Sequence, residues 1–198
     1  MTETPAAEQH PAAVFNVEDW LQDAHMPEES AEVYKRADVI GELSALRRKI
    51  EVAQEAAAGA EASAAETSEL TTLTAQYEEL VQTFCDSQLT IYARALSPDQ
   101  KRAMRAAHEE RVKDLTPVQQ NTEYGYDLLA ASIVAVRPFG GPRTEVSWDH
   151  ATIRSMENAI GATQMSQVLQ AHQAAQNRLP AVDADFLRRP SGEDDGQR

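Results

Sequence analysis

The sequence is organised around residues 37–96, ADVIGELSALRRKIEVAQEAAAGAEASAAETSELTTLTAQYEELVQTFCDSQLTIYARAL. Within it, apolar residues recur at alternating steps of four and three in two sets: Val39, Leu43, Leu46, Ile50 and Ala53, then Leu70, Leu73, Tyr77, Leu80 and Phe84. This spacing places the side chains on one stripe of a helix, as in two helices lying side by side. The stretch therefore predicts two helical arms.

The alanine-rich segment between the arms leaves two arrangements open. Its only strong helix breaker is Gly59, and alanine favours a continuous helix. One unbroken helix would favour an intermolecular seam, whereas a bend near residues 59–63 would give an antiparallel hairpin. A hairpin returns the chain to Val33, where the alternating segment LTIYARAL at residues 89–96 can pair as a strand, with Val33 near Ile91. We expect the hairpin, at about residues 38–84, between strands at about 31–36 and 89–96.

The second half of the chain reads as helical. Ser97-Pro98 and Thr116-Pro117 are helix starts, each with a capping hydroxyl and a proline in the first turn. The second of these helices is predicted to run to Val136 and to supply the centre of the core with Leu128, Leu129, Ile133, Val134 and Val136. Residues 144–148 are expected to be extended, and helices are expected at 149–160 and from 163 to about 179.

The fold class expected is mainly α with a minor β part, the hairpin and its strands packing on a small C-terminal helical domain. Residues 1–14 and 188–198 are polar and rich in Pro, Gly, Ala or acids, so we expect a disordered leader and a disordered tail. Residues 15–96 would then hold a short helix, the hairpin and the strands. Residues 97–187 would hold the helical core domain.

Composition limits the partners. The net charge of -14, from 18 basic and 32 acidic residues, argues against nucleic acid and against an anionic membrane surface. No segment approaches the ~20 apolar residues of a membrane span, and the start of the chain does not read as a signal peptide. A single cysteine, Cys85, allows no internal disulfide and suits a reducing compartment. We expect a cytoplasmic protein with a protein partner.

Motifs of catalysis are not found. The five histidines share no metal-binding spacing, and no phosphate-binding glycine loop or nucleophile motif occurs. The expectation is a protein without enzymatic activity, catalytic residues, metal or cofactor. Cys85, which follows Phe84, reads as a small buried hydrophobe rather than as a reactive thiol.

Two groups of residues are candidates for contact with a partner. Trp20 and Leu21 are the apolar content of a short acidic helix at 16–24, although Trp20 could instead fold back into the core. Met156, Met165 and Leu169 lie on the inner faces of the last two helices. Methionine suits surfaces that accept varied partners, but the two methionines could instead be ordinary core.

Three segments together resemble the siphovirus-type tail assembly chaperones of long-tailed bacteriophages that infect actinobacteria. They are VEDWLQDAHMPEESAEVYKRADVIGELSALRRKIE at residues 17–51, SQLTIYARALSPDQKRAMRAAHEE at 87–110, and EYGYDLLAASIVAVRP with TEVSWDHATIRSMENAIGATQMSQVLQAHQAAQN at 123–138 and 144–177. The resemblance covers about residues 16–187, as an order of segments rather than a single fingerprint. The long alanine-rich insert is a departure from it.

The resemblance implies a role without catalysis in the host cytoplasm. Such chaperones coat the tape measure protein, a long helical protein, before tail tube subunits replace them, and they are often made in two lengths by frameshifting. Two other functions fit the residues: a structural tail or head-completion component of the phage, or a bacterial coiled-coil adaptor. The adaptor would form a homo-oligomer through the seam at 39–84.

Overall fold

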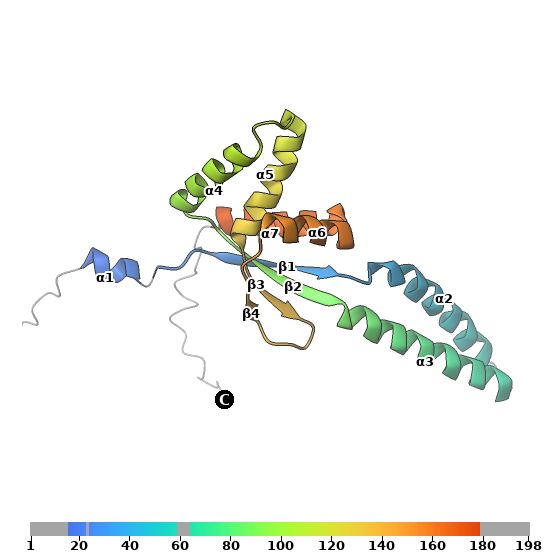
Figure 1. Ribbon diagram of the computed structural model, residues 1–198. Coiled ribbons are helices and arrows are strands. Elements are labelled where there is room, and N and C mark those ends of the chain that lie inside the picture. The colour runs from blue at the N-terminus through green and yellow to red at the C-terminus, as the bar shows by residue number, and fades with distance from the viewer. Residues whose placement is uncertain (1–15, 23, 59–63, 179–198) are drawn as a thin grey trace, which may run out of the picture.

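The computed structural model describes residues 16–22, 24–58 and 64–178, and within them the protein is mainly α with a small antiparallel sheet (Figure 1). The elements in chain order are α1 (Val17–Gln22), β1 (Glu28–Tyr34), the 3₁₀ helix η1 (Ala37–Val39), α2 (Ile40–Ala57), α3 (Ala64–Asp86), β2 (Gln88–Arg94), α4 (Pro98–Arg111), α5 (Pro117–Ser132), β3 (Ile133–Pro138), β4 (Thr144–Glu145), α6 (His150–Ile160) and α7 (Ala162–Asn177). The predicted fold class is confirmed. The leader at 1–14, the bend at 59–63 and the tail at 188–198 lie outside the described residues.

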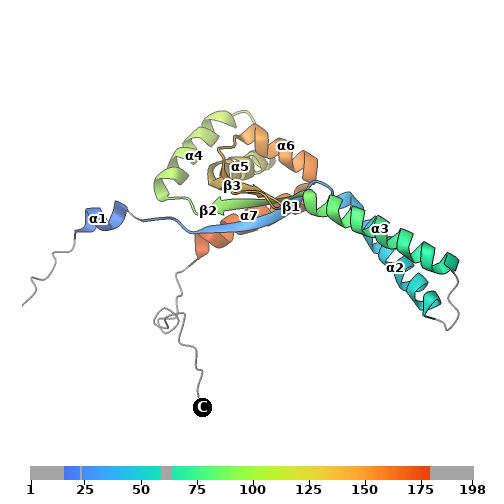
Figure 2. The same ribbon diagram turned by 90° about the horizontal axis from the view of Figure 1, so that it is seen from below.

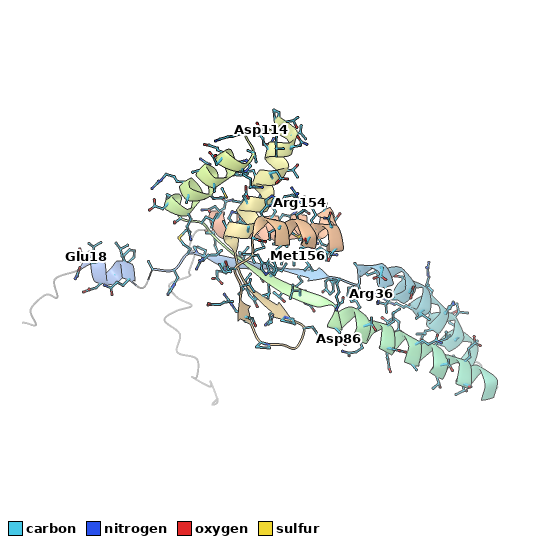
Figure 3. All side chains as sticks on the ribbon, in the orientation of Figure 1. Glu18, Arg36, Asp86, Asp114, Arg154 and Met156 are labelled. Carbon is cyan, nitrogen blue, oxygen red and sulfur yellow. The ribbon has the colours of Figure 1, made fainter. Side chains whose placement is uncertain are left out.

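The two arms form the predicted hairpin. Figures 1 and 2 show α2 and α3 lying side by side and projecting from one end of the sheet. At the root, Val39 is buried and the rings of Tyr34 and Phe84 stack with centroids 4.3 Å apart. Arg36 and Asp86 mark the two points where the chain enters and leaves the projection (Figure 3). Apart from Val39, the seam residues predicted from the 3–4 spacing are half-buried, and α2 contains no fully buried residue.

The strands on either side of the hairpin pair with each other, as predicted. The sheet has the order β1-β2-β3-β4, and every neighbouring pair is antiparallel. Val33 lies opposite Leu89, and Ala31 lies opposite Ile91, so Val33 is near Ile91 as expected, one diagonal step along the ladder, and both belong to the same core cluster. Residues two apart on a strand share a face, because side chains alternate with a period of two, so Val33 and Ile91 point to the same side of the sheet.

The continuous helix predicted through Val136 is wrong. Helix α5 ends at Ser132, and Ile133 is already extended with φ -71° and ψ 124°. The segment Ile133–Pro138 is strand β3, which pairs with β2 on one side and β4 on the other. The physical reason is its content of β-branched residues, which pack better on a pleated sheet than in a helix.

One hydrophobic core lies between the sheet and the helices α5, α6 and α7. Its buried members are Ala31, Val33, Ile91, Ala93, Leu129, Ile133, Ile153, Met165, Val168 and Ala171. Of the five residues predicted at its centre, Leu129 and Ile133 are buried, while Leu128, Val134 and Val136 are half-buried. The core therefore draws on residues from both halves of the chain.

Local capping explains where the helices begin. Ser97 accepts from the Gln100 N–H while the Gln100 side chain accepts from the Ser97 N–H, and Thr116 and Gln119 repeat this reciprocal pair. Helices α6 and α7 are separated only by Gly161, with φ 85° and ψ 156°. Within the described residues, no helix combines the length and the apolar character needed to cross a membrane.

Candidate partner-binding surfaces

Helix α1 stands apart from the rest of the described chain. Asn16 caps it, its Oδ1 accepting from the Glu18 N–H at 2.9 Å. Figures 1 and 2 show α1 at the opposite side of the sheet from the hairpin, and Figure 3 shows Glu18 far from the labelled residues of the body. Trp20 is 64% exposed and Leu21 is 55% exposed. The alternative reading, that Trp20 fills the core, is therefore wrong.

The other predicted contact residues are not brought together on one open surface. Met165 is buried in the core, and Leu169 and Met156 are half-buried and pack against it. Met156 lines a groove at the hairpin end of the sheet, whereas Met165 and Leu169 line a separate cleft between α5 and α7. The alternative that the methionines are ordinary core holds fully for Met165 and in part for Met156.

The cleft between α5 and α7 has a volume of about 220 Å³. Leu129, Met165 and Leu169 form apolar parts of its wall, and Gly125 lies in the wall on α5. At one end the Tyr126 hydroxyl contacts the Glu157 carboxylate. The volume is below the ~300–1,000 Å³ of most small-molecule sites, so the cleft suits one or two side chains of a partner better than a cofactor.

Helix α2 carries three consecutive basic residues, Arg47, Arg48 and Lys49. A groove of about 480 Å³ lies between α2 and α3, lined in part by Arg48, Lys49, Leu73 and Val52, the last being 68% exposed. The side of α2 near the tip thus combines positive charge with exposed apolar surface. This surface and α1 lie at opposite ends of the molecule (Figure 2).

A cluster of charged side chains that sequence reasoning missed joins α4, α5 and α6. His108 Nδ1 on α4 lies 2.7 Å from the Asp127 carboxylate on α5. Arg111 donates to Glu123 Oε2 at 2.9 Å and also contacts Asp127. Glu123 and Asp127 are four residues apart on one helix face, and that spacing is the signal by which the pair could have been found.

Glu123 connects this cluster to α6. His150 Nε2 lies 2.5 Å from its Oε2, and Arg154 contacts its Oε1. Arg154 also lies over the Tyr126 ring, 5.6 Å from the centroid. Because the carboxylate is mostly buried and meets basic groups from two other helices, the cluster fixes how α4, α5 and α6 pack.

The charges around Glu123 predict an acid-sensitive contribution to stability. Burial raises the pKa of this carboxyl, but the hydrogen bond from Arg111 and the charges of His150 and Arg154 outweigh burial, so the pKa lies below the ordinary 4.5. The unfolded chain therefore binds the proton first, and Glu123 contributes stability that is lost as pH falls from about 4.5 through the folded pKa.

The variant Glu123→Gln should consequently flatten the loss of stability below about pH 4.5, measured as urea midpoints at successive pH values. Glu110→Gln, at an exposed carboxylate on α4 that pairs with Lys113, should lose stability below about pH 4.5 as the parent does. If Glu123→Gln lost stability below about pH 4.5 as steeply as the parent, Glu123 would not be the source of the acid sensitivity.

Among the residues that the structure describes, no group of three or more His, Cys, Asp or Glu side chains is arranged to hold a metal ion. Cys85 is a half-buried free thiol near the root of the hairpin. No family model, no curated protein and no solved structure matches this chain.

Proposed function

We propose that this protein is a phage tail assembly chaperone that acts without catalysis and binds the tape measure protein during tail assembly. The resemblance of its segments to that family implies this function. The observation that carries the proposal is α1, a short helix that stands apart from the sheet, on the side away from the hairpin, and keeps its apolar residues Trp20 and Leu21 exposed. An exposed Trp is a typical anchor for a protein partner, and Leu21 beside it adds exposed apolar surface.

A helical client can be bound by helices that lie beside it. The hairpin seam is closed on itself, so a client would meet the outer faces of α2 and α3 rather than replace one of them. Together α1 and the hairpin offer contacts at two distant points of the chaperone. Two weak contacts on one long client raise the overall affinity through effective concentration.

Co-expression with the tape measure protein of the same phage tests the proposal. The two proteins should elute as one soluble complex, and the client should precipitate when expressed alone. The double variant Trp20→Asp with Leu21→Asp should lose about 30-fold or more in affinity, since an anchor of this kind contributes ~2 kcal/mol or more. It should stay folded, because neither residue belongs to the buried core.

Glu18→Gln with Asp19→Asn is the matched control, on the same helix but at its polar positions, and should retain the complex. Separate elution of the unaltered protein and the tape measure protein at low salt would exclude the proposal. Abundant peptides of this chain in purified virions would instead favour a structural component. An oligomer abolished by Leu46→Asp with Leu73→Asp would favour a coiled-coil adaptor.

A further inference from the structure

The outer edge of strand β1 is a second candidate surface for binding a partner. The strand lies at one end of the sheet and pairs only with β2. The Lys35 N–H donates to the Ser87 carbonyl at 3.2 Å, and the Ala95 N–H donates to the Pro27 carbonyl at 2.9 Å. Because bonded pairs alternate along an antiparallel ladder, odd-numbered residues of β1 face β2 and even-numbered residues direct their backbone groups outward.

At one end of this edge, the Gln164 side chain already bonds the outward backbone groups of β1. The Tyr34 N–H donates to Gln164 Oε1 at 2.6 Å, and Gln164 Nε2 donates to the Tyr34 carbonyl at 3.0 Å. The Gln164 amide thus makes the two bonds that a peptide group of a further strand would make. Among the described residues, the outward backbone groups of Ser30 and Glu32 have no such partner.

Helix α7 provides a floor beside the edge. It packs on β1 and β2 through Val168 and Ala171, which are buried, while the next face of the helix extends past the strand. There Gln167, Gln170 and Ala174 are exposed and line a groove of about 580 Å³ together with β1. An added strand would place alternate side chains over this floor of amide and methyl groups.

The charge of β1 selects the occupant. Glu28, Glu29 and Glu32 lie within seven residues that contain no basic side chain. Arg143 donates to Glu28 at 2.7 Å and Arg178 contacts Glu29, whereas Glu32 has no basic partner among the described residues.

A second copy of this chain is a poor occupant of the edge. An antiparallel pairing of two β1 strands centred on Ser30 would set Glu28 of each copy opposite Glu32 of the other. Like charges directly opposite each other on neighbouring strands are destabilising. The groove therefore favours a segment of opposite charge over self-pairing.

We propose that the β1 edge and α7 form a docking groove for an extended, lysine- or arginine-rich segment of another protein, which adds to the sheet as a fifth strand beside β1. The segment pairs with the backbone of Ser30 and Glu32, and its basic side chains meet the Glu32 carboxylate, which has no basic partner among the described residues. This inference goes beyond the proposed function, since it requires neither α1 nor a tape measure protein as the client.

The test is a binding titration of the full chain with a fluorescent peptide of about ten residues in which lysine and valine alternate. The peptide should bind, and replacing its lysines by glutamate should abolish binding. Methylation of all its backbone nitrogens, which keeps the charges but removes the N–H donors, should weaken binding about tenfold or more. Equal binding of the methylated peptide would overturn the strand pairing, and equal binding of the glutamate peptide would overturn the charge selection.

Variants of the protein test whether the peptide binds at the edge of β1. Ser30→Pro removes an outward N–H without touching the β1–β2 ladder, because proline is tolerated at the outer side of an edge strand. It should weaken binding of the lysine peptide about tenfold, whereas Ser30→Ala, which keeps the N–H, should bind as the parent does. Glu32→Lys should weaken binding without changing the thermal midpoint.

The peptide controls do not depend on whether Ser30→Pro folds, so they test the site on their own. Failure of the unaltered protein to bind the lysine peptide would overturn the proposal. A dimer of the parent that Ser30→Pro converts to monomer would also overturn it, in favour of self-pairing. Because the titration contains no tape measure protein, its result is separable from that of the co-expression experiment.

Discussion

Replacing Ile91 by alanine should lower the free energy of unfolding by about 2–5 kcal/mol, a large part of the ~5–15 kcal/mol that holds a typical domain together. Ile91 is fully buried on the interior strand β2, opposite Ala31 on one side and Val136 on the other. Its side chain fills the layer between the sheet and the helices. The strands on both sides limit how far the structure can collapse, so the cavity persists and adds its cost to the lost transfer energy.

Urea unfolding followed by circular dichroism measures this effect. The midpoint should fall while the dependence on urea concentration stays the same, because the surface exposed on unfolding hardly changes. Val52→Ala is the matched control, since Val52 is 68% exposed on α2, and it should change the free energy by no more than about 0.5 kcal/mol. A loss below about 1 kcal/mol for Ile91→Ala would mean that the core closes around the missing atoms.

Gly161→Ala should destabilise the protein by about 1–3 kcal/mol, because the backbone there lies in a region that only glycine occupies readily. With φ 85° and ψ 156°, Gly161 turns the chain between α6 and α7 in a single residue. A Cβ at this position meets no atom within 4 Å, so the expected cost is backbone strain alone. The strain would also shift the start of α7, where Gln164 holds the end of β1.

Gly125→Ala is the control of opposite sign. Gly125 lies inside α5, and a Cβ there also meets nothing within 4 Å. In ordinary helical conformation, alanine is favoured over glycine by about 0.5–1 kcal/mol, so this variant should be more stable than the parent. Thermal melts of both variants measure the two changes in stability. A Gly161→Ala variant as stable as the parent would show that the backbone at Gly161 is not strained by a Cβ.

The parts of the fold that follow from local patterns could be predicted from the sequence. The 3–4 spacing of Leu43, Leu46, Leu73 and Tyr77 fixes the seam of the hairpin, and the alternation around Ile91 identifies β2. Strand β3 could not be predicted in the same way. Its residues continue the apolar run of α5 without a glycine or proline between them, and such a run does not distinguish helix from strand.

The surfaces were less predictable than the fold. Trp20 and Leu21 were found because large apolar residues in an acidic helix are conspicuous, but only the structure shows that they stay exposed. The two hydrogen bonds between the Gln164 side-chain amide and the Tyr34 backbone join residues 130 positions apart in sequence. The edge beside them depends on strand order. Neither is a local property of the chain, so no pattern in one segment could indicate them.

The hairpin enters and leaves the body through β1 and β2, which are direct neighbours in the sheet. The sheet therefore brings the two ends of the hairpin together whatever lies between them. The hairpin is in effect an insertion at the turn between β1 and β2. Its helix α3, of 23 residues, is about 35 Å long at 1.5 Å per residue. Lengthening or shortening both arms by whole turns would change the reach of the protein without altering its core. The length of the hairpin can thus change in evolution with the distance that the protein must span, without a change in the fold of the body.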